Sequence, residues 1–243
     1  MVRPTHVFFD FGDTLVDLRP LAPAMSNTIR LRMPELGKFA EEIGWAWVAS
    51  TGEETRKAQG ADYRTGLDIA ARAFQRAVMK VGVHIGQAAS VECVREAWRE
   101  YLEKAELHED ANLEVLRTLR GMTETMAIVT DSDTSMVEPL LRRLRIEEFF
   151  DTIVVSDSVG AYKPDPRIFL AAMARAGGKP ESSVFVSDSI VDLEGASSVG
   201  MGAVWINREG TRPKTHIQGM RTIRGLRDLP LLLRAWGGQK PER

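Results

Sequence analysis

Short apolar runs that each end in a polar or acidic residue are the feature that most constrains the fold of this chain. A continuous apolar run rich in Val and Ile is typical of a strand that helices cover on both faces, as in a parallel sheet. The runs lie at residues 7–9, 126–129, 153–155, 184–186 and 203–206. We therefore predict a parallel β-sheet.

Helical patterns separate the later runs. They are expected around residues 113–119, at 136–146 and at 167–176. Alternation of strand and helix predicts a doubly wound α/β fold. Ligands of such folds bind beyond the carboxyl ends of the strands. Asp10, Thr130 and Asp188 each follow a run, so we expect them to converge on one site.

Residues 18–106 show no strand pattern, and we expect an all-helical insert between the first and second strands. Apolar residues recur at helical spacing over 67–81 and over 91–102, with Ser90 as the N-cap of the second helix. Three tryptophans are expected in the core of this insert: Trp45, Trp47 and Trp98. The α/β core then takes residues 1–17 and 107–235. The polar segment 236–243 is expected to be a flexible tail.

Composition and charge restrict the partners of the chain. A net charge of −2 gives no bulk attraction to nucleic acid or to a membrane surface. No run reaches the roughly 18 apolar residues of a membrane span, and no signal peptide is evident. The single cysteine, Cys93, fits a reducing compartment. We expect a cytoplasmic protein that binds neither nucleic acid nor membrane; its oligomeric state is left open.

Four segments, in the right order, resemble the motifs of the haloacid dehalogenase superfamily. Residues 10–15 (DFGDTL) look like the first motif, which usually reads Asp-x-Asp-Gly-Thr-Leu. The strand ending at Thr130 is similar to the second motif. Residues 162–169 (YKPDPRIF) resemble the third motif, and residues 186–196 (VSDSIVDLEGA) resemble the fourth. The resemblance covers the α/β core. It implies a Rossmann-like fold of the phosphoglycolate-phosphatase type, in which the helical insert is the cap that closes over the site and selects the substrate.

The resemblance also implies a chemistry. Asp10 would attack phosphorus and form an aspartyl-phosphate. Mg²⁺ would offset the negative charge of phosphate and carboxylate. Its protein ligands would be Asp10, the backbone carbonyl of Gly12 and Asp188, with Asp192 orienting the metal site. The implied activity is hydrolysis of a small phosphorylated compound.

Three further residues complete the implied site. Thr130 would donate its hydroxyl to a phosphate oxygen. Lys163 would stabilise developing negative charge and orient Asp10. Asp131 stands where members of the family often have Asn, and we expect it to be a turn residue beside the bound substrate.

Gly12 departs from the family pattern. Phosphatases of the family carry an aspartate there, which serves as general acid and base. Losing such a group typically costs about 10²- to 10⁴-fold in rate. Asp13 could take its place, because Asp tolerates unusual turn dihedrals. Alternatively, the proton comes from the cap, or the leaving group needs no acid.

Other branches of the family remain open as alternatives. The phosphonate-cleaving branch has a small residue at the position of Gly12, but it also needs a cap lysine. The haloacid-cleaving branch resembles this chain at Ser187, but it works without metal and lacks an acid where this chain has Asp188. A third alternative is a catalytically impaired member that binds a phosphorylated ligand or a protein partner.

Overall fold

The structure is a computed structural model that describes residues 3–213 and 215–236. The chain forms two compact units, and each is described by itself. The α/β unit comprises Met1–Asp17, Glu106–Thr130 and Leu141–Arg243. The helical unit comprises Leu18–Ala105 and Asp131–Leu140. Residues 237–243 of the expected tail lie outside the described residues, whereas its first residue, Trp236, is buried and so is not part of a flexible tail. The limits of core and cap as functional domains stay predictions.

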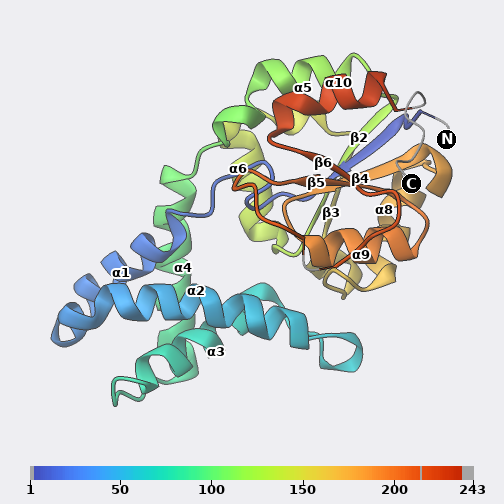
Figure 1. Ribbon diagram of the computed structural model, residues 1–243. Coiled ribbons are helices and arrows are strands. Elements are labelled where there is room, and N and C mark those ends of the chain that lie inside the picture. The colour runs from blue at the N-terminus through green and yellow to red at the C-terminus, as the bar shows by residue number, and fades with distance from the viewer. Residues whose placement is uncertain (1–2, 214, 237–243) are drawn as a thin grey trace. The chain divides into compact units, whose positions relative to one another are not determined.

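A six-stranded sheet in the order β3-β2-β1-β4-β5-β6 forms the centre of the α/β unit (Figure 1). All neighbouring strands are parallel. The strands are β1 (His6–Phe9), β2 (Thr125–Thr130), β3 (Thr152–Val155), β4 (Ser183–Ser187), β5 (Gly202–Ile206) and β6 (Arg221–Ile223). The five strands predicted from apolar runs are confirmed. The edge strand β6 was not predicted, because a segment of only three residues carries too little pattern.

Helices cover both faces of this sheet, as a buried parallel sheet requires. Helices α8 and α9 pack on one face, while α5 and α10 lie together on the other (Figure 1). Phe8, Phe169 and Phe185 belong to the apolar core beneath α8 and α9. The helices are α5 (Leu113–Arg120), α7 (Ser156–Val159), α8 (Pro166–Ala176), α9 (Ile190–Ser198) and α10 (Leu229–Arg234); α6 (Thr134–Leu144) is divided between the two units. The fold is therefore the predicted doubly wound α/β fold.

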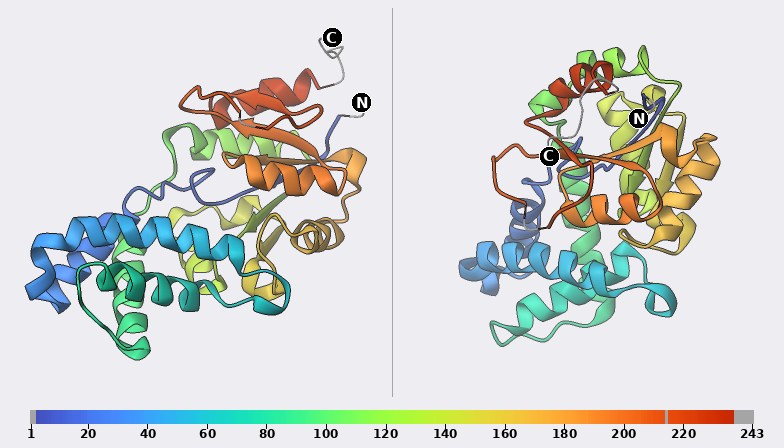
Figure 2. Two further views of the ribbon diagram at one scale, coloured as in Figure 1. Left: turned by 60° about the horizontal axis from the view of Figure 1, so that its bottom comes forward. Right: turned by 45° about the vertical axis from the view of Figure 1, so that its right-hand side comes forward.

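Four helices build most of the helical unit and pack on one another (Figure 2). They are α1 (Leu21–Arg32), α2 (Ala40–Lys57), α3 (Gly66–Met79) and α4 (Gln87–Lys104). The prediction of an all-helical insert between the first and second strands is confirmed. Among the described residues, no helix combines the length and the hydrophobicity needed to cross a bilayer.

Two details of the helical insert differ from the prediction. Helix α4 begins at Gln87 after Gly86, so Ser90 lies inside the helix rather than at its N-cap. Its hydroxyl donates to the Gly86 carbonyl at 2.9 Å, a bond that satisfies the hydroxyl without a cap. Trp45 is also not a core residue, since it is 58% exposed whereas Trp47 is 1% exposed. The two side chains are two positions apart on one helix and so point in different directions.

Candidate active site

The carboxyl ends of the central strands bring the first and fourth motifs together. Strands β1 and β4 pair in register, with Phe9 opposite Val186. The amide of Asp10 continues this pairing and donates to the Val186 carbonyl at 3.0 Å. Asp10 therefore lies beside Ser187 and Asp188, as the sheet topology predicts. Thr130 ends the other neighbouring strand, β2, and is buried.

The hydroxyl of Thr14 joins the two acidic residues. Thr14 Oγ1 lies 3.0 Å from Asp10 Oδ2 and 3.0 Å from Asp188 Oδ1. It also accepts a hydrogen bond from the Asp188 amide at 3.2 Å. One hydroxyl has one proton, so it can donate to only one of the two carboxylates at a time. Two carboxylate oxygens thus converge on a single donor, and the sequence motif gave Thr14 no role.

Lys163 supplies positive charge on the other side of Asp10. This lysine is 3% exposed, and its ammonium donates to Asp10 Oδ1 and, at 2.7 Å, to Asp192 Oδ2. Asp192 Oδ2 also accepts the Ser187 hydroxyl at 3.2 Å. A buried lysine with two carboxylate partners is a charge-assisted arrangement, which fixes its orientation. Asp192 therefore contacts Lys163, and through it acts on Asp10.

Burial of these carboxyl groups changes their acidity. Burial raises the pKa of Asp10 to about 7, with Lys163 opposing the rise and Asp192 and Asp188 adding to it. Burial also raises the pKa of Asp188, against the hydrogen bond from Thr14. In both cases burial disfavours the negatively charged form of the carboxyl group. A bound cation would offset this effect.

The donor set fits a hard divalent cation. Mg²⁺ prefers carboxylate and carbonyl oxygens. Asp10 and Asp188 present two carboxylate oxygens that share one hydroxyl donor, and Gly12 offers a backbone carbonyl two residues after Asp10. The excess of acidic over basic side chains in this buried cluster is consistent with a cation. These three residues are therefore the candidate ligands, as the resemblance implies.

Asp13 occupies an unusual backbone conformation. Its φ is 53°, in the left-handed region where the family usually has Gly. The turn therefore forms with Asp, as expected from the tolerance of this residue. The carboxylate is half-exposed, and its Oδ1 lies 3.8 Å from Nε2 of His108. Asp131 directly follows Thr130, and it belongs to the helical unit rather than the α/β unit.

Arg208 and Asp110 are site residues that the motifs did not indicate. The Arg208 guanidinium donates to the carbonyls of Asp13 and Thr14 at 2.5 and 2.9 Å. It also donates to the carboxylate of Asp110, with a shortest separation of 3.0 Å. Both residues are distant in sequence from this loop, which Arg208 contacts directly and Asp110 only through Arg208. The available signal was only the position of Arg208 shortly after the end of β5.

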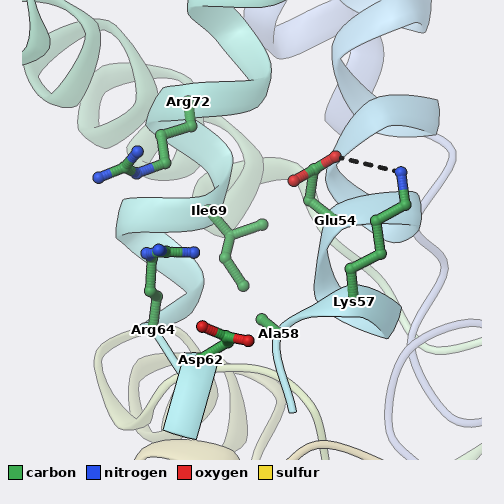
Figure 3. A pocket seen from close by; sticks show the side chains of 7 residues that line it. All are labelled: Glu54, Lys57, Ala58, Asp62, Arg64, Ile69 and Arg72. Atoms are coloured by element: carbon green, nitrogen blue, oxygen red, sulfur yellow. Dashed lines mark ion pairs between the residues drawn. The ribbon is translucent and has the colours of Figure 1, made fainter.

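The helical unit has a pocket of a different character. It lies between α2 and α3 (Figure 3). Its lining residues are Glu54, Lys57, Ala58, Asp62, Arg64, Ile69 and Arg72. Lys57 Nζ lies 3.6 Å from Glu54 Oε1, and both side chains are in contact with solvent. Because charges of both signs are mixed here and are exposed, the pocket offers no activated nucleophile.

Comparison with known proteins identifies the family. The model for haloacid dehalogenase-like hydrolases matches residues 4–200. The chain therefore belongs to this family of hydrolases. The resemblance found from the four motifs is confirmed, and the protein is an enzyme of this class.

The relatives include both phosphatases and dehalogenases. Glyceraldehyde 3-phosphate phosphatase from Pyrococcus furiosus is 29% identical over 221 residues, which cover 84% of this chain and 81% of that protein. (S)-2-haloacid dehalogenase 4A from Burkholderia cepacia is 34% identical over 101 residues, which cover 42% of this chain and 44% of that protein. For several of the curated relatives, the match spans less than half of their length. Others are named phosphoglycolate phosphatase and phosphoserine phosphatase.

Solved structures confirm the fold. An L-2-haloacid dehalogenase superposes with a TM-score of 0.78 at 24% identity, covering 96% of this chain and 100% of that one. At this identity the likeness shows a shared fold and not a shared substrate.

Proposed function

We propose that this protein is a Mg²⁺-dependent phosphatase that hydrolyses a small phosphorylated compound through an aspartyl-phosphate on Asp10. The observation that carries the proposal is the pair of carboxylates, buried Asp10 and partly buried Asp188, that meet at Thr14 Oγ1. Haloacid cleavage needs a nucleophilic carboxylate but no second acid to hold a metal. Asp188 therefore favours phosphate over halide as the group that is transferred.

The residues divide the reaction between them. An oxygen of Asp10 attacks phosphorus, the bond from phosphorus to the leaving oxygen breaks, and that oxygen takes up a proton. Water then attacks the phosphorus of the acyl phosphate, which releases inorganic phosphate and restores Asp10. Lys163 orients Asp10 and, with the Thr130 hydroxyl, stabilises negative charge on the phosphoryl oxygens. Mg²⁺ held by Asp10, Asp188 and the Gly12 carbonyl would neutralise charge on the phosphoryl group.

Gly12 determines which substrates suit this site. Without a side chain at that position, the leaving oxygen takes its proton from Asp13 or from the cap, or the substrate has a leaving group that needs no acid. The exposure of Asp13 and its separation of 3.8 Å from His108 are compatible with proton exchange with solvent. We expect esters with good leaving groups to be cleaved far faster than alkyl esters.

The test compares phosphate release from p-nitrophenyl phosphate, acetyl phosphate and simple alkyl phosphates with Mg²⁺ present. The native protein should cleave the first two, and Gly12→Asp should speed alkyl ester cleavage by about 10²-fold or more. If the native protein cleaves alkyl esters well, Asp13→Asn should remove that activity selectively. Phosphate release from none of these compounds by either protein would contradict the proposal.

Release of halide from 2-haloacids would support the haloacid-cleaving alternative instead. The relative from Burkholderia cepacia and the hydrogen bond between Ser187 and Asp192 are the observations in its favour. Halide release that is insensitive to EDTA, with no phosphate release, would decide for it. Binding of a phosphorylated compound without turnover would support the alternative of a catalytically impaired family member.

A further inference from the structure

The loop from Phe11 to Val16 makes three backbone hydrogen bonds within itself. The amide of Asp13 donates to the Val16 carbonyl at 2.8 Å. The amides of Leu15 and Val16 donate to the Phe11 carbonyl at 2.9 and 3.0 Å. The carbonyls of Asp13 and Thr14 accept instead from a side chain outside the loop. Backbone carbonyls that are shielded from water need such partners.

Arg208 is that partner. Its Nη1 donates to the Asp13 carbonyl at 2.5 Å, and its Nη2 donates to the Thr14 carbonyl at 2.9 Å. The side chain is 25% exposed, so these bonds are shielded from most of the solvent. A planar guanidinium can reach two adjacent carbonyls at once, and a single ammonium cannot reproduce that geometry.

Asp110 anchors the guanidinium to the rest of the α/β unit. Arg208 Nε lies 3.1 and 3.2 Å from the two carboxylate oxygens of Asp110. Asp110 is 7% exposed, and its Oδ2 also accepts the Leu226 amide at 2.7 Å. A Cβ on Gly225 would lie 2.4 Å from the same oxygen, so glycine is needed for this close approach. Asp110 therefore fixes the position of the Arg208 guanidinium.

The held loop carries the residue that joins the catalytic carboxylates. Thr14 Oγ1 contacts Asp10 and Asp188, while the carbonyl of the same residue is held by Arg208. Gly12, whose carbonyl is a candidate metal ligand, directly precedes Asp13, whose carbonyl Arg208 also holds. Movement of this backbone would displace Thr14 Oγ1 from both acids, and misplacement of catalytic groups costs rate steeply.

We propose that Arg208, fixed by Asp110, is a positioning residue that holds the Asp13–Thr14 backbone, and with it the Asp10–Thr14–Asp188 constellation, in the reactive arrangement. This inference rests on the proposed function for its catalytic consequence. The positioning itself is a property of the loop, so it can be tested whether or not phosphate is the group transferred.

The test uses Arg208→Ala in the full chain, with Arg212→Ala as the matched control. Arg212 is exposed and lies in the same segment after β5. We expect Arg208→Ala to lower kcat by about 10- to 100-fold and to weaken Mg²⁺ binding by a similar factor, while KM changes little. Mg²⁺ affinity is measured by calorimetry without substrate. The control should retain native values.

Chemical rescue separates positioning from general structural support. Ethylguanidinium added to Arg208→Ala should restore part of kcat, because its planar donors can reach the two carbonyls, whereas ethylammonium should not. Arg208→Lys should behave like the alanine variant. Asp110→Asn should show a smaller defect, since an amide oxygen still accepts from Leu226. If Arg208→Ala does not fold, Arg208→Lys and Asp110→Asn carry the test.

Hydrogen exchange supplies a readout that needs no activity. The amides of Asp13, Leu15 and Val16 should exchange faster in Arg208→Ala than in the native protein and the control. Unchanged exchange, together with unchanged kcat and Mg²⁺ affinity, would overturn the inference. If exchange is faster in Arg208→Ala but the native protein releases no phosphate, the positioning role of Arg208 stands and the proposed function is rejected.

Discussion

The two units of this protein bury charge to different extents. The α/β unit buries Asp10, Asp110, Lys163 and Asp192. Among the described residues of the helical unit, the buried side chains are neutral apart from Asp133, whose carboxylate accepts the amides of Gly66 and Leu67 at 2.8 and 2.9 Å. The ion pairs of the helical insert lie at the surface, as between Arg76 and Glu54 at 2.6 Å. Buried charge is costly unless it is paired, so its concentration at the strand ends indicates function there.

Both units nevertheless rest on an apolar core. Trp47, Phe74 and Ile43 are fully buried in the helical unit, as Phe8 and Phe185 are in the α/β unit. The units therefore share an apolar core and differ in the amount of buried charge, which is greater in the α/β unit and costs stability. The substitutions below test this difference.

Removal of the buried ammonium group of Lys163 should have the largest effect on stability. Lys163→Met leaves Asp10 and Asp192 buried without their shared partner, which should cost about 3–5 kcal/mol of unfolding free energy and most of the activity. Arg76→Met removes an exposed partner of Glu54 and should cost at most about 1 kcal/mol. Denaturant unfolding in EDTA measures both. Equal losses would contradict the comparison.

The two tryptophans of α2 provide a second contrast, within the helical unit. Trp47 is buried, and its indole nitrogen donates to the Ala70 carbonyl at 2.9 Å. Trp47→Ala should therefore cost about 3–5 kcal/mol. Trp45→Ala, on the exposed side of the same helix, should stay within about 0.5 kcal/mol. Thermal unfolding checks the pair, and a large loss at Trp45 would indicate that this side is covered in solution.

Cys93 gives the smallest effect, which appears only at alkaline pH. Burial raises the pKa of its thiol in the folded protein, with Arg32 opposing. In the unfolded chain a thiol loses its proton near pH 8.5. Above that pH the folded state binds more protons than the unfolded state, so stability falls as pH rises. In Cys93→Ala this decline between pH 8 and pH 10 should be shallower; an identical decline would show that the thiol does not contribute.

Local pattern was sufficient for most of the fold. Each central strand is a continuous apolar run, and Asp10, Lys163 and Asp188 follow recognisable motifs. The structure then brought Asp10, Lys163, Asp188 and Asp192 together, as converging strand ends require. Helix ends were less predictable. Ser90 could cap a helix by composition, but Gly86 begins it earlier.

Contacts between residues far apart in the sequence could not be predicted from sequence patterns. Arg208 holds carbonyls 195 and 194 residues earlier in the chain, and Asp110 holds Arg208 across 98 residues. No periodicity or motif connects these positions. The role of Thr14 was equally hidden, because the motif states its identity but not that its hydroxyl lies between two acids. Such contacts follow only from the three-dimensional arrangement.

Trapping the phosphoryl group on Asp10 tests the proposed mechanism. The native protein is mixed with Mg²⁺ and acetyl phosphate, quenched in acid within one turnover, and analysed by intact and peptide mass spectrometry. We predict one added phosphoryl group on the peptide that contains Asp10, sensitive to hydroxylamine and absent from Asp10→Asn. Turnover that persists in Asp10→Asn, or a phosphoryl group on another residue, would show that Asp10 is not the nucleophile.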